Sequence, residues 1–442
     1  MQPDFNALVA EAVAHHTAGR LREAEASYLA ALEISRSHIS ITHNLALIAA
    51  ARGDHLLAVR RLESVIAAEP SYFSAHYNRA AALVALGRRS DAIRGFQSAS
   101  DIEPADYGSH RALAFLWLAE GERGRALDHF GRTYDLRRGE DRIGIANQSL
   151  TTSTRSKLLH DAAQFRHLSR SRRDTHRFER MATTYESVAS DFPLAVRKLT
   201  DNEMMRLGED YNTAIHLDSA PEISGRAVGP RTDHDHLVGQ FLRGSGAVYF
   251  DDLLTPDALA RLKRFMLEST IWHDFSHIGG FVASYLEDGL ACPLILQIAD
   301  ELRRAFPELI GEHPLTQAWA FKGLTPNASV DVHLDDGAVS LNFWVTPAEA
   351  NLNPDRGGLV VCRVPPPSDW VMQSYDADVE RIVSFLAENA HDNLIVPYRE
   401  NRAVLFRSRL FHHSDAPHFA EGYENHRINV TLLFGSRGAA AA

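Results

Sequence analysis

The first 140 residues carry a pattern of glycine, small and large apolar positions that repeats every 34 residues. One position of the period is glycine in every unit, two further positions are always alanine, and a fourth is always a large apolar residue. These positions are Gly19, Gly53, Gly87 and Gly121; Ala12, Ala46, Ala80 and Ala114; Ala24, Ala58, Ala92 and Ala126; and Tyr28, Leu62, Phe96 and Phe130. Self-similarity at such a period predicts a row of stacked helix–turn–helix units.

The residue types at these positions explain how one unit packs. Alanines allow its two helices to approach closely, and the glycine ends the first helix in a left-handed conformation. Pro70 and Pro104 then stop the second helix of two units. The pattern resembles the tetratricopeptide repeat over roughly residues 5–138, which implies an α-solenoid whose concave face binds peptides or partner proteins. The alternative is an array that only scaffolds or dimerises the rest of the chain.

The period is lost after about residue 140, where segments such as KLLHDAAQFRHL predict helices outside any repeat register. Residues 218–236 are rich in proline, glycine and charge, so we expect them to form a linker. His234 and His236 lie there as part of an HDH triplet. In a loop without neighbouring strands, these two histidines are expected to be solvated rather than bound to metal.

From Val238 onward, short apolar runs alternate with turn signals, and helices are predicted near residues 255–269 and 293–306. The pair Thr255-Pro256 suits the start of the first helix, because proline is tolerated in a first helical turn. Strand-like runs then follow one another: TQAWAFKG, SVDVHLDD, AVSLNFWVTP, GGLVVCRV, LIVPYR, RAVLFRSRLFHH and RINVTLLFG. Many short strands after one helical layer predict a barrel or a sandwich.

Two of these runs contain candidate metal ligands. If DVHLDD forms a strand, Asp331, His333 and Asp335 share one face, and a histidine and a carboxylate two residues apart can grip one cation. If VLFRSRLFHH continues as one strand, alternation places His412 with the apolar residues of the interior and His413 with the arginines outside. His412 is therefore the better candidate of this adjacent pair.

The last run adds a candidate for anion binding. Alternation along HRINVTLLFG places Arg427, Asn429 and Thr431 on one strand face. An arginine that faces an interior is costly unless it pairs with an anion, and its guanidinium fork suits a carboxylate. The alternative for Arg427 is a structural salt bridge to an aspartate or glutamate of the chain.

Two histidines and one carboxylate leave three coordination positions open, the facial arrangement of non-haem Fe(II) oxygenases. The stretch from Trp319 to Gly435 resembles the double-stranded β-helix of the 2-oxoglutarate oxygenases. The resemblance implies that His333 and Asp335 form the H-x-D motif, that His412 is the distal ligand, and that Arg427 binds the far carboxylate of 2-oxoglutarate. Because halogenating members lack the carboxylate of H-x-D, Asp335 favours hydroxylation or a related oxidation.

Further residues of this region are weaker candidates. Asn429 stands where the family often has a serine, but it can still donate a hydrogen bond to the co-substrate. Asn342 can bind the co-substrate or simply fill a polar pocket. Alternation places Lys322 and Trp319 on opposite faces, so at most one of them faces the site. The remaining histidines of the region are expected not to be ligands: His413, His418 and His426.

The expected activity follows from this resemblance. Fe(II), 2-oxoglutarate and O2 would hydroxylate a C–H bond, with release of succinate and CO2. A repeat array joined to such a barrel resembles the hydroxylases that act on proteins, so we expect a peptide or protein substrate held partly by the concave face of the array. The alternatives are a free amino acid or other small metabolite as substrate, and a non-catalytic adaptor.

Composition and charge limit the other possibilities. A formal net charge of −11 argues against general nucleic-acid binding, and the arginines between Arg166 and Arg180 are expected to form a solvated helix face. No apolar stretch suits a membrane span or a secretory signal. Two cysteines, Cys292 and Cys362, are expected to be reduced in a cytoplasmic protein.

The chain is therefore expected to be a multidomain α + β protein, an α-solenoid followed by a jelly-roll-like barrel with flanking helices. Its expected parts are four repeats in residues 1–140, a helical connector in 141–235, an oxygenase domain in 236–436 and a disordered tail in 437–442. Nothing in the sequence indicates the oligomeric state.

Overall fold

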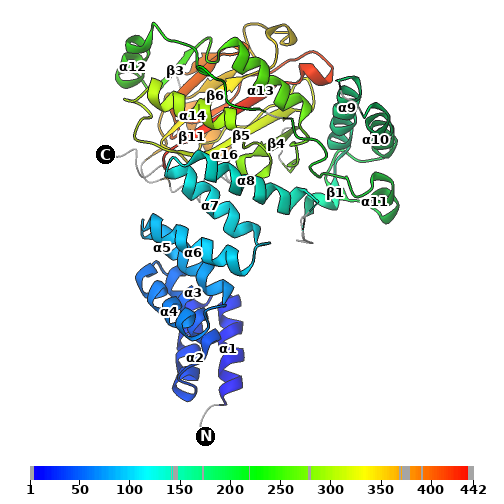
Figure 1. Ribbon diagram of the computed structural model, residues 1–442. Helices are drawn as coiled ribbons and strands as arrows, with labels where there is room; N and C mark the ends of the chain where they lie inside the picture. The colour runs from blue at the N-terminus through cyan, green and yellow to red at the C-terminus, as the bar shows by residue number, and fades with distance from the viewer. Residues whose placement is uncertain are drawn as a thin grey trace. The chain divides into compact units, whose positions relative to one another are not determined.

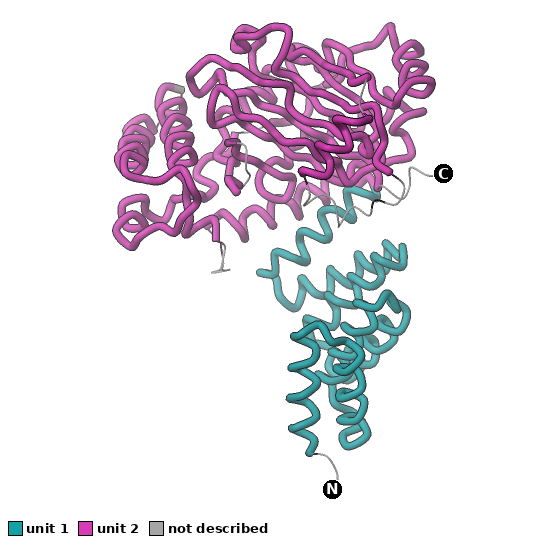
Figure 2. Tube along the Cα trace, turned by 180° about the vertical axis from the view of Figure 1, so that it is seen from behind, with its two compact units in different colours: residues 1–120 teal, residues 121–442 magenta. Residues whose placement is uncertain are grey.

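The computed structural model describes residues 4–140, 142, 148–171, 174–218, 220–276, 280–367, 370, 379–389 and 392–436. The chain divides into two compact units, residues 1–120 and 121–442 (Figure 2). The boundary falls inside the predicted fourth repeat, between its two helices. The tail predicted for residues 437–442 lies outside the described residues.

Unit 1 consists of consecutive helices (Figure 1). These are α1 (Phe5–Thr17), α2 (Leu21–Ile34), α3 (Ile39–Ala51), α4 (His55–Ala68), α5 (Phe73–Ala85), α6 (Arg89–Ile102) and α7 (Tyr107–Ala119). The repeat period appears in local contacts as well: the His76 ring nitrogen bonds to the Pro70 carbonyl at 2.9 Å, and His110 bonds to Pro104 at 3.2 Å. Unit 1 is therefore an array of TPR-like helix pairs.

The periodic positions have the roles that the sequence predicts. Gly19, Gly53 and Gly87 follow α1, α3 and α5 with φ angles of 73°, 82° and 70°, the left-handed conformation expected of a helix C-terminal glycine. The repeated alanines of this unit are fully buried, and Tyr28, Leu62 and Phe96 fill the neighbouring core. The predicted helical repeat is confirmed.

Unit 2 begins with α8 (Arg123–Arg138), which is fixed to the rest of the unit at its last residue. Arg138 is buried and pairs through two nitrogens with the Asp288 carboxylate, each at 3.0 Å. The other helices are α9 (Arg155–Ser171), α10 (Thr175–Ala189), α11 (Asp201–Leu207), α12 (His234–Arg243), α13 (Pro256–Glu268), α14 (Pro293–Ala305) and α16 (Val379–Asn389). α13 and α14 confirm the two helices predicted for this region.

Two antiparallel sheets form the β part of unit 2, and a short β1 (Thr152–Ser153) and β2 (Arg197–Lys198) pair lies apart from them. The larger sheet has the order β3-β9-β6-β11-β5-β4. Its strands are β3 (Ala247–Phe250), β4 (Phe281–Tyr285), β5 (Leu315–Gly323), β6 (Val339–Trp344), β9 (Ala403–Arg407) and β11 (Ile428–Phe434). The smaller sheet has the order β10-β7-β8, with β7 (Leu359–Val361), β8 (Leu394–Val396) and β10 (His412–Ser414).

Three local predictions are wrong. SVDVHLDD is not a strand. Its residues are irregular, and its one element of strand pairing is an isolated bridge between His333 and His412. VLFRSRLFHH is not one strand either: β9 ends at Arg407, and a turn leads the chain from the larger sheet to β10 in the smaller one. The face alternation assumed for both segments therefore fails. The HDH triplet begins α12 instead of lying in a loop.

Among the described residues, no helix combines the length and the apolar character that a membrane span requires. Both cysteines, Cys292 and Cys362, are buried free thiols.

The left-handed glycines generate a first prediction. Gly53→Ala meets no side chain, because no atom lies within 4 Å of an added Cβ, so only backbone strain opposes it. We expect it to lower the free energy of unfolding of the repeat array by about 1 kcal/mol. Urea unfolding followed by circular dichroism measures this change. Gln97→Ala, on the exposed face of α6, is the matched control and should leave stability unchanged or slightly raised; an equal loss in both variants would contradict the assignment.

Candidate metal centre

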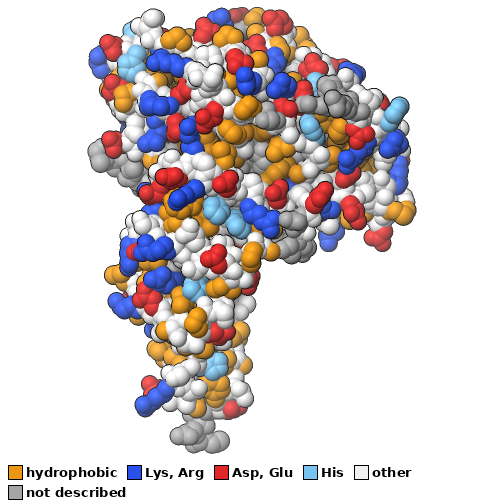
Figure 3. All heavy atoms as spheres, in the orientation of Figure 1, with side chains coloured by type: hydrophobic (Ala, Val, Ile, Leu, Met, Phe, Trp, Pro, Cys, Tyr) orange, Lys and Arg blue, Asp and Glu red, His pale blue; other side chains and the backbone are white. Residues whose placement is uncertain are grey.

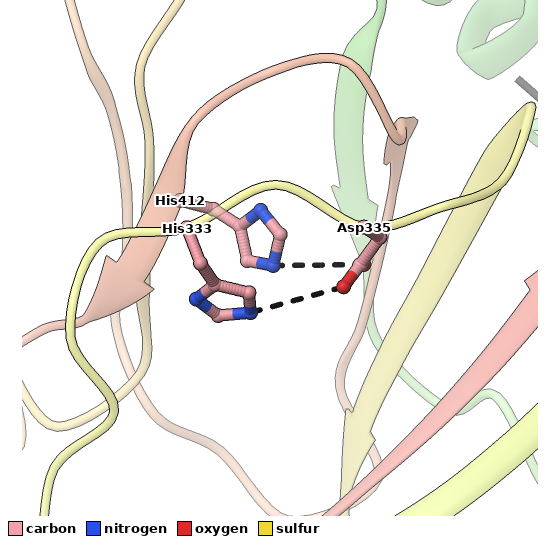
Figure 4. Close-up of side chains that lie close together, drawn as sticks. All are labelled: His333, Asp335 and His412. Carbon is pink, nitrogen blue, oxygen red and sulfur yellow. Dashed lines mark ion pairs between the residues drawn. The ribbon is translucent and has the colours of Figure 1, made fainter. Parts of the chain in front are cut away.

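The structure brings His333, Asp335 and His412 together, although the first two lie between β5 and β6 and the third begins β10 (Figure 4). His333 Nε2 lies 3.7 Å from Asp335 Oδ1, and His412 Nε2 lies 3.6 Å from Asp335 Oδ2. One ligand atom from each of the three side chains lies within 4.8 Å of the others. Asp331, on the same expected face, is not a member of this cluster.

The backbone holds the two histidines side by side. The N–H of His333 donates to the His412 carbonyl at 3.1 Å, and the N–H of His412 donates to the His333 carbonyl at 3.0 Å. This reciprocal pair is a single rung of antiparallel ladder, and it places the two imidazole centroids 4.2 Å apart. Two segments far apart in the sequence are thereby fixed in register at the cluster.

Hydrogen bonds also set the tautomers of the rings. His333 Nδ1 lies 2.8 Å from the Asp331 carbonyl, and His412 Nδ1 lies 3.1 Å from the Leu410 carbonyl. Because a carbonyl only accepts, each Nδ1 must carry the proton, and the neutral ring then turns the Nε2 lone pair toward the cluster. Two lone pairs and a carboxylate repel one another unless a cation lies between them.

Burial strengthens this arrangement. The Asp335 carboxylate accepts a hydrogen bond from Ser340 Oγ at 2.6 Å, and Ser340 lies 2.8 Å from Ser408 Oγ. The pKa of His412 is lowered to about 4, mainly by burial and also by His333, while Asp335 opposes the shift. His412 is therefore neutral at physiological pH, as a metal ligand must be. The donor set fits a non-haem Fe(II), and it accepts other first-row divalent ions as well.

Arg427 immediately precedes β11 and lines the same cavity as the three residues. It is buried, and its Nε and Nη2 donate to the carbonyls of Gly357 and Gly358 at 3.0 and 3.1 Å. Burial lowers its pKa to about 10. In the described part of the chain no carboxylate lies within salt-bridge distance of Arg427, so the structural salt bridge considered from the sequence is not seen.

The glycine pair 357–358 is what brings those carbonyls to Arg427. Gly357 has a φ of 86°, and a Cβ on Gly358 would lie 2.0 Å from the Val396 carbonyl oxygen. No other residue type fits there without moving β8. Two carbonyl dipoles alone only partly balance a buried guanidinium, which leaves this corner of the cavity suited to an anion.

The two asparagines predicted as co-substrate ligands also line the cavity. Asn429 Nδ2 donates to Asn342 Oδ1 at 3.3 Å, and the Thr431 hydroxyl donates to the same oxygen. Asn429 Oδ1 is buried and has no hydrogen-bond partner in the described structure. Since amide oxygen and nitrogen can exchange places by a flip, Asn429 can offer a ligand either an acceptor or a donor.

Trp319 and Lys322 lie on opposite faces of β5, as expected. Trp319 is partly exposed and lines the cavity together with Phe321. Lys322 is completely buried on the other face, with its Nζ 3.1 Å from the centroid of the Tyr423 ring and with no hydrogen-bond partner among the described residues. His413 lines the cavity too, but His418 bonds to Asn327 and His426 lies outside the lining.

Residues that the sequence did not single out complete the site. Ser340 is two residues before Asn342 on β6, so strand alternation from Asn342 could have identified it. Phe321 follows from Trp319 by the same rule. Ser408 could not be found in this way, because it lies in the turn after β9 rather than on a strand. Between its side chains the cavity has a volume of only about 20 Å³, room for one or two waters. A larger ligand must therefore displace some of these side chains.

Comparisons with known proteins do not assign the chain. No protein-family model and no curated protein matches it. Among solved structures, a MamA RS-1 ArsTM double mutant is 23% identical over 32% of this chain and 79% of its own, with a TM-score of 0.30. MamA 41-end from Desulfovibrio magneticus RS-1 is also 23% identical, over 31% and 78% of the two chains, with a TM-score of 0.30. At these TM-scores the likeness carries no argument about function.

The buried Lys322 generates a prediction about pH. Burial lowers the pKa of Lys322 well below its ordinary value, so the unfolded chain binds this proton more tightly than the folded protein. Stability therefore rises with pH between the lowered and the ordinary pKa of the lysine. Lys322→Met keeps the shape without the amine and should raise Tm at neutral pH while flattening that rise.

Thermal unfolding from about pH 7 to about pH 10, the range below the ordinary lysine pKa, tests this prediction. Lys263→Met, a partly exposed lysine paired with Glu400, serves as the control and should not flatten the profile. A lower Tm for Lys322→Met at every pH would show that the amine stabilises the fold.

Proposed function

We propose that the chain is an Fe(II)- and 2-oxoglutarate-dependent oxygenase whose iron is held by His333, Asp335 and His412. The observation that carries the proposal is the convergence of two Nε2 lone pairs on one carboxylate, in the same cavity as a buried arginine that pairs with no carboxylate of the described residues. In this proposal the two antiparallel sheets are the halves of a double-stranded β-helix. The cluster lies where β10 of the smaller sheet meets the loop between β5 and β6.

Residues of the cavity would position the co-substrate. Arg427 would pair with the far carboxylate of 2-oxoglutarate through its guanidinium fork, and Asn429 and Thr431 would extend the polar floor along β11 toward the metal ligands. Asn429 and Thr431 are two residues apart on the strand, so their side chains lie on the same face about 7 Å from each other. Fe(II) with 2-oxoglutarate and O2 supplies the oxidising chemistry, yielding succinate, CO2 and a hydroxylated product.

The aromatic side of the cavity is the part left for the substrate. Trp319 and Phe321 project from β5 beside the polar floor, since Trp319 pairs with Thr431 and Phe321 with Asn429 in the strand register. Phe281 on β4 continues the row, with its ring centroid 4.6 Å from that of Phe321. Phe281 is buried and supports the row, whereas Trp319 and Phe321 are partly exposed beside the cavity, as is typical of ligand contact surfaces.

We propose a peptide or protein as the substrate, because a TPR-like array is a common peptide-binding surface. A free amino acid or other small metabolite is the alternative, and a non-catalytic adaptor is the second. Both cysteines are free thiols, in keeping with a cytoplasmic site of action.

The activity itself is tested by succinate release. Protein loaded with Fe(II) should convert 2-oxoglutarate to succinate in air, and His412→Ala and Arg427→Ala should each reduce the rate at least about 100-fold, as expected when a ligand or an anion clamp is lost. His418→Ala is the control, since His418 bonds to Asn327 at 2.9 Å and is not a member of the cluster. Equal rates in His412→Ala and in the unchanged protein would refute the oxygenase proposal.

The substrate class is tested with two probe pools, the free amino acids and a set of acetylated, amidated pentapeptides. We expect the peptides to stimulate succinate release. For the most active compound of the stimulating pool, Trp319→Ala should raise KM more than it lowers kcat. Trp319→Phe should bring KM back toward the value of the unchanged protein. Stimulation by the amino acids alone would favour the metabolite alternative, and equal KM values in the two Trp319 variants and the unchanged protein would remove Trp319 from the substrate surface.

A further inference from the structure

A second cavity, of about 510 Å³, lies between α14 and the segment of residues 225–234. None of its lining residues lines the metal cavity. The segment is the one that the sequence predicts to be a linker. In the structure it packs against α14 and forms one wall of the cavity.

Two side chains of α14 hold the segment in place through hydrogen bonds to its backbone. Gln297 accepts a hydrogen bond from the Ile223 N–H at 2.8 Å and donates to the carbonyls of Ile223 and Gly225, each at 3.1 Å. Glu301 Oε2 accepts from the N–H groups of Ala227 and Val228 at 2.9 and 2.8 Å. The carboxylate of Glu301 is thus satisfied by the backbone of the segment, and the cavity wall is held in place before any ligand binds.

The charged groups that face the cavity are Arg226, Arg231, Arg304, His234 and Glu301. Arg231 is neutralised by Asp233, with N–O distances of 2.8 and 3.1 Å. His234 lies 3.4 Å from Glu308. The Glu301 carboxylate is hydrogen-bonded to the backbone of the segment, and the remaining cations of the lining are the exposed side chains of Arg226 and Arg304.

Arg226 and Arg304 have no carboxylate within salt-bridge distance in the described part of the chain. Over the described residues, the backbone N–H groups of Gly225 and Arg226 also have no acceptor. On the face drawn in Figure 3, basic and acidic side chains are interspersed, and the whole chain carries a charge of −11. Two guanidinium groups without an ion pair among the described residues, and two amide donors without an acceptor there, thus belong to residues that line one cavity.

We propose that this cavity binds a small molecule carrying phosphate groups. Guanidinium groups bind phosphate oxygens in pairs, and main-chain N–H groups add donors to the same anion. The volume lies in the range of cavities that hold cofactor-sized ligands. Among the described residues, no phenyl, phenol or indole ring lines the cavity, so the phosphate groups of the ligand are recognised and a stacked base is not.

The probe for this site is pyrophosphate, titrated into the full chain by calorimetry at low salt and without added metal. We expect one molecule bound per chain, with an affinity that falls as salt is added. The double variant Arg226→Gln, Arg304→Gln should weaken binding at least about tenfold, because each charge-assisted hydrogen bond to an anion contributes substantially. The control double variant Arg243→Gln, Arg409→Gln removes the same charge from exposed positions outside the cavity and should keep the affinity.

A further variant and a second anion test whether the binding is specific to this cavity and to phosphate groups. His412→Ala should bind pyrophosphate as the unchanged protein does, because the site is independent of the metal centre, and citrate should bind more weakly. No binding, equal binding by the Arg226→Gln, Arg304→Gln variant, loss in His412→Ala, or citrate binding as tight as pyrophosphate would each overturn the proposal. Circular dichroism confirms that each variant is folded before titration.

Discussion

The candidate site depends on one rung of backbone hydrogen bonds, the reciprocal pair between His333 and His412. Neither residue lies in a long strand that could fix its position by many bonds. The rung brings together a loop of the larger sheet and the first residue of β10 in the smaller one, and Asp335 follows because it is two residues from His333. Once both Nδ1 atoms donate to carbonyls, the remaining lone pairs can only face each other and the carboxylate.

A second constraint acts at the other end of the cavity. Arg427 is buried with two carbonyls as its hydrogen-bond partners, and those carbonyls belong to a glycine pair that tolerates no side chain at Gly358. A buried cation so incompletely paired costs free energy in the empty protein. An anionic ligand offsets that cost when it binds, so the same feature that weakens the fold strengthens the case for a carboxylate-bearing co-substrate.

The sequence predicted the repeat array well, because each unit repeats a local rule: a glycine at a left-handed position and alanines where helices touch. It also predicted α13, α14 and the strands β5, β6 and β11, whose sequences are short runs rich in apolar residues. Face alternation failed at residues 329–336 and 408–411, since neither segment is a strand. His412 is nevertheless buried and His413 only half-buried, because the chain turns after Arg407 and His412 begins a new strand. Contacts set by the tertiary fold, such as Ser408 with Ser340, have no local signal.

In the proposed function, His333, Asp335 and His412 hold an iron to which 2-oxoglutarate binds with the help of Arg427. The most direct measurement is the visible absorption spectrum of the protein mixed anaerobically with Fe(II) and 2-oxoglutarate. We expect a metal-to-keto-acid charge-transfer band that is absent in His412→Ala and weakened in Arg427→Ala. A folded, iron-loaded protein without such a band would contradict it, and the adaptor alternative would then be preferred.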